Sequence, residues 1–223
     1  MEKYIKLLEK NDLFKGFNSK DLEDILGYLS AKVVIYKKND VILLQGDPVS
    51  FVGIVISGAI QVIKEDIGGN ISILAHFGSN DIFAETFACA YIKESPVTVE
   101  AKEDCEIMFI NFKKLIKDCH KSCTFHSRLV ENMLSLIARK NILLNQKNEI
   151  LSKRTTREKL LTYFSGQIKK SHSRRFSIPY SREGLANYLC VDRSALSREL
   201  SKMRDEGLIK FKKNEFEVLF SNS

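Results

Sequence analysis

Residues 181–209 read SREGLANYLCVDRSALSRELSKMRDEGLI, and this stretch decides the fold of the C-terminal part of the chain. Ser181 is a good N-cap for a first short helix. Asp192 is a good N-cap for a second helix. Gly207, just past the last turn, is the glycine that would end this helix. Only three or so residues separate the two helices, which is the spacing of a helix-turn-helix. We therefore predict a helix-turn-helix in this stretch.

The second of these helices, expected over 193–205, has two chemically different faces. The inward apolar face of the motif is formed by Leu185, Ala186, Leu189, Val191, Leu196 and Leu200. At 100° per residue, Arg193, Ser194, Ser197 and Arg198 share an arc of about 140° on the other side. Guanidinium and hydroxyl groups at the start of such a helix are the ones that reach base edges in DNA. A solvated amphipathic helix would show a similar pattern, but capping, spacing and charge agree, so we predict DNA contact.

A hairpin is expected directly after the helix-turn-helix. Ile209 and Phe211 before the turn 212–215, and Phe216 and Val218 after it, alternate as in a two-stranded ribbon. The turn has a basic tip, so the hairpin is suited to phosphate contact as a wing. The predicted DNA-binding residues are Ser181, Arg193, Ser194, Ser197, Arg198, Lys202, Lys212 and Lys213.

The charge of the chain is concentrated in the same region. The 223 residues carry a formal net charge of +7; residues 151–223 hold 16 basic and 8 acidic side chains, a net +8, and residues 1–150 have a net charge of −1. A basic block on an otherwise neutral chain indicates contact with a polyanion, although a solvated lysine-rich surface would have the same composition.

Composition excludes several classes of protein. A hydrophobic fraction of 44% is enough for packed cores and rules out a disordered or collagen-like chain. The most apolar window, 51–63, is well short of the ~20 residues that span a bilayer, and the N-terminus lacks the apolar region of a signal peptide. We expect a cytoplasmic protein with no membrane contact and with reduced thiols. No phosphate-binding glycine loop, nucleophile elbow, HExxH or paired-carboxylate pattern occurs, so an enzyme is not expected.

The first half of the chain is rich in short β-branched runs between turn signals. This spacing predicts a small antiparallel barrel or sandwich, preceded by short helices within 4–29. The expected strands lie in VVIY (33–36), VILLQGD (41–47), FVGIVISGAIQVIKE (51–65), ISILAHFGSND (71–81), VTVEA (97–101) and CEIMFI (105–110).

A segment of about 127–152 contains neither glycine nor proline and predicts one long helix. Two adjacent apolar seams run along it, so it can pack against its own domain and against a partner helix, which predicts a homodimer. Asn141 and Asn148 lie in one seam and resemble register-fixing polar residues, although asparagines buried within one monomer would look the same. The pattern leaves open which seam faces the partner. The first seam is Val130, Leu134, Ile137, Asn141, Leu144, Asn148 and Leu151; the second is Leu129, Met133, Leu136, Lys140, Leu143, Lys147 and Ile150.

Four further stretches occur in a characteristic order: QGD (45–47), ISGAIQV (56–62), GGNISILAHFGSNDIFAE (68–85) and CEIMFINFKKL (105–115). Together with the helix-turn-helix they resemble the Crp/Fnr family of bacterial transcription regulators over nearly the whole chain. The resemblance implies an α+β fold: an N-terminal antiparallel β-roll of the cyclic-nucleotide-binding type over 1–126, a long dimerisation helix over 127–152 and a C-terminal winged helix-turn-helix over 153–223. It further implies a homodimeric, sequence-specific regulator that binds double-stranded DNA, responds to an effector in the β-roll and contacts RNA polymerase.

The chain departs from this family at the phosphate cassette. Members that bind cAMP begin the cassette with Gly-Glu and later carry Arg-Ser or Arg-Thr, whereas here Ala84 precedes Glu85 and the second position reads Ser95-Pro96. A cyclic phosphate needs a cation or free N–H groups, and Pro96 removes one donor, so cAMP is not expected as the effector. Glu85 would either bind a ligand hydroxyl or cap the local turn.

The expected effector residues lie in two places. Phe83, Glu85, Phe87, Ser95 and Val97 lie in or next to this cassette, and Leu143 and Leu144 lie on the long helix. Their apolar members suggest the wall of a pocket for an organic ligand, or a plain hydrophobic core between the roll and the helix. In the recognition helix, Ser197 and Arg198 resemble the family's DNA-reading pair and Arg193 matches a further reading residue. Ser194 replaces the usual glutamate, which implies a different half-site.

The cysteines suggest a second hypothesis. On a helix, Cys119, Cys123 and His126 would share one face and would suit zinc or another transition metal, or the two thiols could form a redox switch. Small buried thiols near a surface histidine explain the same pattern, and we expect no metal or other cofactor. The alternative function is a redox- or metal-responsive sensor module whose basic C-terminal block contacts protein or membrane. An iron–sulfur cluster held by N-terminal cysteines is excluded because no cysteine precedes Cys89. We interpret Cys89, Cys105 and Cys190 as packing residues.

Overall fold

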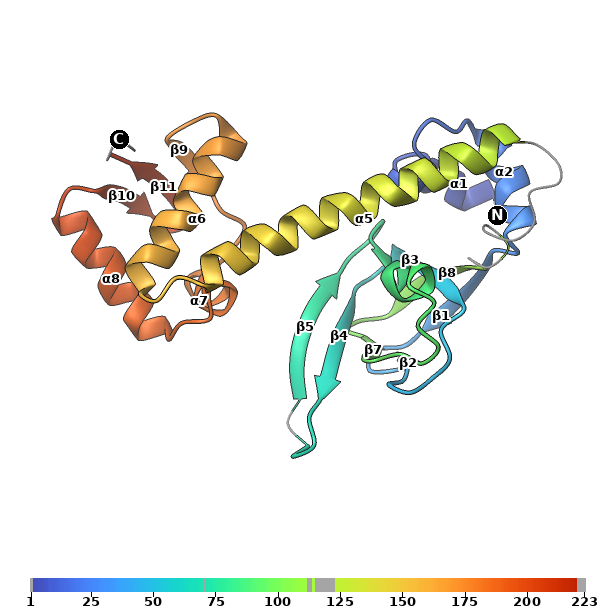
Figure 1. Cartoon of the computed structure of the whole chain (residues 1–223), viewed down its shortest axis with the longest axis horizontal. Coiled ribbons are helices and arrows are strands. Elements are labelled where there is room, and N and C mark those ends of the chain that lie inside the picture. Colours follow the sequence, from blue (N-terminus) through green and yellow to red (C-terminus); the bar gives the residue numbers. More distant parts are fainter. Residues whose placement is uncertain (1, 70, 112–113, 115–122, 220–223) are drawn as a thin grey trace. The chain divides into compact units, whose positions relative to one another are not determined.

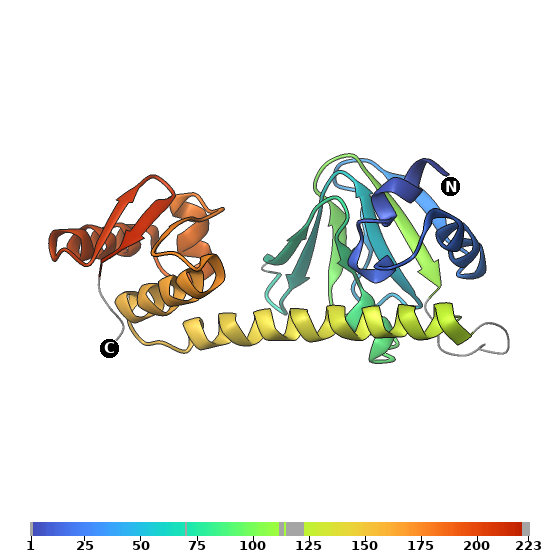
Figure 2. The same cartoon turned by 90° about the horizontal axis from the view of Figure 1, so that it is seen from above.

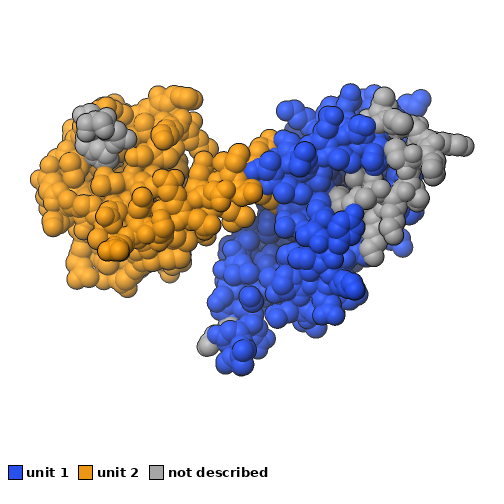
Figure 3. Space-filling view, viewed as in Figure 1, with its two compact units in different colours: residues 1–138 blue, residues 139–223 orange. Residues whose placement is uncertain are grey.

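The computed structural model describes residues 2–69, 71–111, 114 and 123–219, and Figure 1 shows the order of its elements. The chain divides into two compact units, residues 1–138 and residues 139–223, which are coloured separately in Figure 3. Helix α5 (Cys123–Leu151) contributes residues to both units. Within the described ranges, no helix is long and apolar enough to cross a membrane.

The first unit is an antiparallel β-roll, as the sequence predicts. Its two four-stranded sheets have the strand orders β1-β8-β3-β6 and β2-β7-β4-β5. The strands are β1 (Lys32–Tyr36), β2 (Val41–Leu43), β3 (Phe51–Ser57), β4 (Ile60–Glu65), β5 (Ile71–Phe77), β6 (Ile82–Phe83), β7 (Thr98–Ala101) and β8 (Cys105–Asn111). The helices are α1 (Glu2–Leu8), the 3-10 helix η1 (Asp12–Phe14), α2 (Ser19–Tyr28) and α3 (Glu85–Cys89). The short elements β6 and α3 were not predicted.

Two apolar cores stabilise this unit. One core lies between the sheets and contains Val55, Ile60, Phe83, Val99 and Ile107. The second lies between one sheet, the N-terminal helices and α5, and its members from α5 are Leu129, Met133 and Leu136. Figure 2 shows the N-terminal half of α5 running below the strands. The roll is therefore held to the helix by burial of apolar surface.

The seam of α5 that packs against the roll is the second one. Leu129, Met133 and Leu136 belong to the second seam of the sequence pattern. Leu143 and Leu144, which were expected in a core or pocket wall with the roll, are 62% and 61% exposed within the chain. Their contribution to an effector pocket stays a prediction.

The other seam of α5 is exposed at most of its positions in the part of the chain that the structure describes, although Ile137 packs against the core of the first unit. Leu134 is 67% exposed, and Asn141 and Asn148 are also exposed, so the alternative of asparagines buried in the monomer is excluded. Asn145 donates a hydrogen bond from Nδ2 to Asn141 Oδ1 at 3.1 Å. The helix thus presents both apolar and amide groups outward.

Polar contacts fix the start of α5 to the N-terminal helices. Asn132 Nδ2 donates to the carbonyl oxygens of Leu13 (3.0 Å) and Lys15 (2.9 Å). Arg128 Nη1 donates to the carbonyl oxygen of Gly16 at 2.5 Å. These bonds satisfy carbonyls at the end of η1 and set where the helix lies against the first unit.

The second unit is a winged helix-turn-helix, in agreement with the prediction. Its three-stranded sheet has the order β10-β11-β9. Its elements after α5 are α6 (Thr156–Ser171), β9 (Arg175–Ser177), α7 (Arg182–Leu189), α8 (Arg193–Asp205), β10 (Ile209–Lys212) and β11 (Glu215–Val218). The core contains Ile150 of α5 together with Leu160, Phe164, Leu185, Leu189, Leu196, Leu200 and Met203. The strand β9 ends at Ser177, two residues before Pro179, whose nitrogen cannot donate to a sheet.

Gly53 in β3 provides a test of packing in the roll. A methyl group at this position would overlap the ring of Phe83, the residue opposite it on β6. We expect Gly53→Ala to lower the free energy of unfolding by about 2 kcal/mol, because overpacking forces a buried ring from its position. Gly27→Ala in α2 is the control: no described atom lies within 4 Å of the added carbon, and alanine favours a helix by about 1 kcal/mol. Urea unfolding of both variants measures the difference, and equal stability would contradict the proposed overlap.

Candidate nucleic-acid interface and effector cassette

Helix α8 has well-defined ends. Asp192 Oδ1 accepts hydrogen bonds from the backbone N–H groups of Ser194 (2.8 Å) and Ala195 (3.0 Å) and from the Ser194 hydroxyl (2.6 Å). The hydroxyl of Ser194, followed by these backbone groups, lowers the pKa of Asp192 because each bond favours the ionised carboxylate. Gly207 follows the last turn with φ of +74°. Both predicted caps are therefore confirmed.

The two faces of α8 are separated as predicted. Leu196, Leu200 and Met203 are fully buried beneath the helix. The predicted reading residues are all exposed: Arg193, Ser194, Ser197, Arg198 and Lys202. A shallow hollow on this outer face is lined by Ser197, Arg198, Ser201, Lys202, Asp205 and Glu206. Three of the predicted residues thus border one surface.

The turn between α7 and α8 is fixed from both sides. Ser181 caps α7, since its hydroxyl accepts from the N–H of Gly184 at 3.1 Å. Cys190 ends α7 in the left-handed conformation, with φ of 50°, which agrees with its interpretation as the residue at a turn position often occupied by glycine, although its side chain is exposed and not packed. Lys159 of α6 donates from Nζ to the carbonyl oxygens of Leu189 (3.0 Å) and Cys190 (3.4 Å). An ammonium group thereby satisfies carbonyls at the end of α7.

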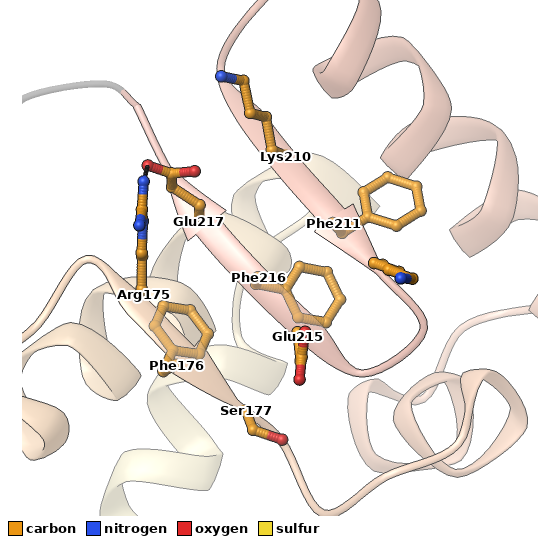
Figure 4. Close-up of a pocket in the computed structure, with 9 residues that line it drawn as sticks. Arg175, Phe176, Ser177, Lys210, Phe211, Glu215, Phe216 and Glu217 are labelled. Atoms are coloured by element: carbon orange, nitrogen blue, oxygen red, sulfur yellow. Dashed lines mark ion pairs between the residues drawn. The ribbon is translucent and has the colours of Figure 1, made fainter.

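The wing is a three-stranded sheet with a two-residue turn at residues 213–214. Phe211, Phe216 and Phe176 form one row across the strands, which Figure 4 shows in a close-up of the hollow that they help to line. The adjacent row contains Lys210, Glu217 and Arg175, with Arg175 Nη2 2.9 Å from Glu217 Oε1. Lys212 and Lys213 are exposed at the tip, where the sequence predicts phosphate contacts.

Arg182 belongs to this surface and was missed in the sequence analysis. Its guanidinium lies over the rings of Phe211 and Phe216, at 5.0 and 5.7 Å from their centroids, and donates to the carbonyl oxygen of Lys213 at 3.4 Å. Burial lowers the pKa of Arg182. A cation between the start of α7 and the wing tip links the two parts of the interface. Arg182 directly follows the predicted N-cap Ser181, and this position was the sequence feature that could have placed it at the interface.

Arg157 at the start of α6 is the second residue that was missed. Its guanidinium forms ion pairs with Glu199 of α8 and with Glu206 just after that helix. Hydrogen bonding to Glu206, and then to Glu199, raises the pKa of Arg157, and the same contact lowers the pKa of Glu206. The partners lie 42 and 49 residues away, so no local pattern reveals the contact.

The cassette of the β-roll is largely closed by its own side chains. Phe83, Glu85, Ser95 and Val97 are buried, and Phe87 is half-buried. The Ser95 hydroxyl donates to the carbonyl oxygen of Val97 at 2.6 Å, and Thr86 Oγ1 donates to Glu85 Oε1 at 3.2 Å. The helix α3 begins at Glu85, directly after the cassette strand β6.

Two family models match the chain. The cyclic nucleotide-binding domain matches residues 33–121, and the Crp-like helix-turn-helix domain matches residues 154–219, so together they cover more than half of the sequence. The order of these two domains agrees with the roll and the winged motif described above. The chain belongs to the Crp/Fnr family of transcription regulators. The family accounts for a DNA-binding helix-turn-helix combined with an effector-binding domain.

Individual relatives support the same assignment. The transcriptional activator protein FnrA of Stutzerimonas stutzeri is 25% identical over 190 residues, which are 83% of this chain and 75% of that protein. The catabolite activator protein of Thermus thermophilus is 21% identical, with coverage of 94% of both chains and a TM-score of 0.54. The regulator CLP of Xanthomonas campestris, described as responsive to c-di-GMP, is 18% identical, with coverage of 92% of this chain and 100% of that one and a TM-score of 0.59. The two structures show a shared fold.

The cassette of this Crp/Fnr protein contains a residue in a conformation that favours glycine. Ala84 adopts φ of 62°, in the left-handed region, which a glycine would adopt without a steric cost. At the second cassette position, the Ser95 hydroxyl is bonded within its own loop and Pro96 has no N–H. Ser95 and Pro96 therefore do not fit a cyclic phosphate in the manner of cAMP-binding members.

The cysteine hypothesis falls mostly outside the described residues. This applies to Cys119 and to the side chain of Cys123, while His126 is half-buried on α5. Across the described part of the chain, no three His, Cys, Asp or Glu side chains form a group that could hold a metal ion. Cys105 is buried and Cys89 half-buried, as expected for packing residues.

Proposed function

We propose that this Crp/Fnr regulator acts as a homodimer that reads a specific DNA sequence with α8 and responds to an effector other than cAMP. The observation that carries the proposal is the outer face of α8, where Arg193, Ser197 and Arg198 are exposed on a helix capped at both ends. RNA polymerase is the partner expected from family membership.

The chemistry of this face supports base reading. The guanidinium of Arg198 can donate two parallel hydrogen bonds to guanine O6 and N7 in the major groove, and the hydroxyl of Ser197 can donate or accept beside it. Ser194 is less free because its hydroxyl already donates to Asp192. Ser181, Lys202, Lys212 and Lys213 suit phosphate contacts, which position the protein without reading the sequence.

The exposed seam of α5 supports dimerisation. Leu134 and Leu144 are more than half exposed, and Asn141 lies between them in the same seam. A second copy of α5 would bury this apolar surface, and paired asparagines would fix the register of the two helices. A dimer also places two recognition helices on a palindromic site, one in each half.

The cassette supports an effector that does not depend on a cyclic phosphate. Phe83 and Val97 supply apolar surface there, and Glu85 supplies a carboxylate that can accept a bond from a ligand hydroxyl. Such an effector controls DNA binding only if it binds the DNA-competent form more tightly than the other form. The class of ligand that these residues favour is a neutral or weakly polar organic molecule.

Arg198→Ala tests base reading. We expect binding to an operator duplex, selected by the full-length protein from a random library, to weaken by about 1–3 kcal/mol, because one bidentate base contact is lost. Binding to a scrambled duplex should change little. Arg204→Ala is the control, since this arginine lies on the same helix but pairs with Asp205. Fluorescence anisotropy at fixed salt measures both duplexes, and equal losses on them would instead identify Arg198 as a phosphate contact.

Leu134→Glu tests the dimer. A charge in the exposed seam would have to be desolvated in a helix pair, so we expect the mass measured by light scattering after gel filtration to fall from dimer to monomer. Ser135→Glu adds the same charge on the next residue, 100° around the helix, and should remain dimeric. A dimer in both variants would place the interface elsewhere.

Titration with cAMP tests the effector assignment. The melting temperature of the full-length protein should not rise in millimolar cAMP, with 5′-AMP as the control nucleotide, because the cassette lacks a cation at the phosphate position. A rise that saturates with cAMP concentration, and is absent with 5′-AMP, would show specific binding and contradict the assignment.

A further inference from the structure

A single guanidinium on α6 binds one carboxylate of the recognition helix and a second one at the residue just after it. Arg157 Nε donates to Glu199 Oε1 at 2.5 Å, while Nη1 and Nη2 bind the two oxygens of Glu206 at 2.8 and 2.9 Å. The three side chains are 31%, 22% and 36% exposed, in this order, so solvent screens the cluster only in part. Each guanidinium nitrogen has a carboxylate partner, an arrangement that the single ammonium group of a lysine cannot reproduce.

The two carboxylates restrain α8 at two points. Glu199 and Glu206 are seven residues apart, which places them on the same side about two turns apart. The apolar underside of α8 holds it against the core, but burial of apolar surface is non-directional and permits small rotations. A guanidinium bound at both points opposes rotation and sliding. Because Arg198 directly precedes Glu199, the same contact bears on the position of the helix backbone from which the Arg198 side chain projects.

The first turn of α6 is itself rigid. Thr155 Oγ1 accepts from the N–H of Glu158 at 3.1 Å, and Glu158 Oε2 accepts from the N–H of Thr155 at 3.0 Å, which forms a capping box. Lys159, on the same segment, binds carbonyls at the end of α7. The start of α6 therefore contacts both helices of the helix-turn-helix, and it follows the end of α5 at Leu151 by only a few residues.

We propose that Arg157 is a positioning residue for DNA recognition: by binding Glu199 and Glu206 it sets the orientation of α8, and with it the direction in which Arg198 meets a base. The proposal rests on the base contact proposed above for Arg198. Arg157 does not touch DNA in this scheme. Its single positive charge also offsets one of the two negative charges that Glu199 and Glu206 place on and just after the helix that approaches the phosphates.

The experiment compares the affinity of full-length variants for the selected operator and for a scrambled duplex. We expect Arg157→Gln and Arg157→Lys to lower the ratio of the two affinities by about tenfold, because the bidentate contact of Arg198 loses its alignment. The slope of log affinity against log salt should stay unchanged, whereas loss of a phosphate contact would reduce its magnitude by about 0.9. Glu199→Gln should also lower the ratio, yet raise affinity for the scrambled duplex, because the protein becomes more positive.

Arg154→Gln is the matched control, since it removes the same charge from an exposed residue three positions earlier. Its affinity ratio should equal that of the wild type. Measurements at 10 °C, with folding verified by circular dichroism, separate positioning from a simple loss of folded protein, which would reduce both affinities equally. If Arg157→Gln does not fold, the same comparison of affinities is made with Arg157→Lys and Glu199→Gln.

The outcomes distinguish the two proposals. A wild-type protein with equal affinity for both duplexes would overturn the proposed base reading. A wild-type protein that prefers the operator, together with Arg157 and Glu199 variants that keep the full preference, would overturn the positioning role alone. A smaller salt slope with an unchanged ratio would make Arg157 a phosphate contact and would also overturn it.

Discussion

Both compact units depend on apolar side chains that the same helix buries at its two ends. Near its start, α5 contributes Leu129, Met133 and Leu136 to the core of the first unit, and near its end it contributes Ile150 to the core of the second. Glycine or proline near either end would weaken or break the helix that presents these core residues, in keeping with a long segment free of both. Since one side of the helix packs into the chain's own cores, the side that carries Leu134 stays exposed within the chain.

The DNA-binding unit shows how local chemistry is combined with distant contacts. Helix ends are fixed by neighbours in sequence, as when Asp192 binds the first N–H groups of α8. The orientation of that helix depends on partners that are far away in the chain, including the apolar core below it and Arg157 of α6. Caps decide where a helix begins, and long-range contacts decide where it points.

This division explains what could be predicted from the sequence. Alternation, turn residues and caps are local signals, so the main strands of the roll, the long helix, the helix-turn-helix and the wing were all found. The strand β6, with two residues, and the helix α3, with five, were not predicted because elements of this length are too short to show a periodic pattern. The exposed reading face of α8 followed from helical geometry, whereas the hydrogen bonds of Arg182 and Arg157 join residues that are 31 to 49 positions apart.

The pocket expectation shows a further limit of local patterns. Periodicity placed Leu143 and Leu144 on an apolar stripe, but it gave no information about which turns of a long helix contribute to the core of the first unit. The residues of α5 in that core are Leu129, Met133 and Leu136, whereas the two leucines are exposed within the chain. The chemistry of the cassette was easier to predict from the sequence than its packing. The type of a residue limits what it can bind wherever it lies; a proline, for example, has no N–H to donate.

The contact between Gly53 and Phe83 connects the packing of the roll with the cassette. The ring of Phe83 occupies the space that a side chain at 53 would need, and Phe83 is followed directly by the first cassette residues, Ala84 and Glu85. A larger residue at position 53 would therefore displace the ring on which the start of the cassette rests. A substitution on the neighbouring strand β3 can in this way change the shape of the cassette with no change in the cassette residues themselves.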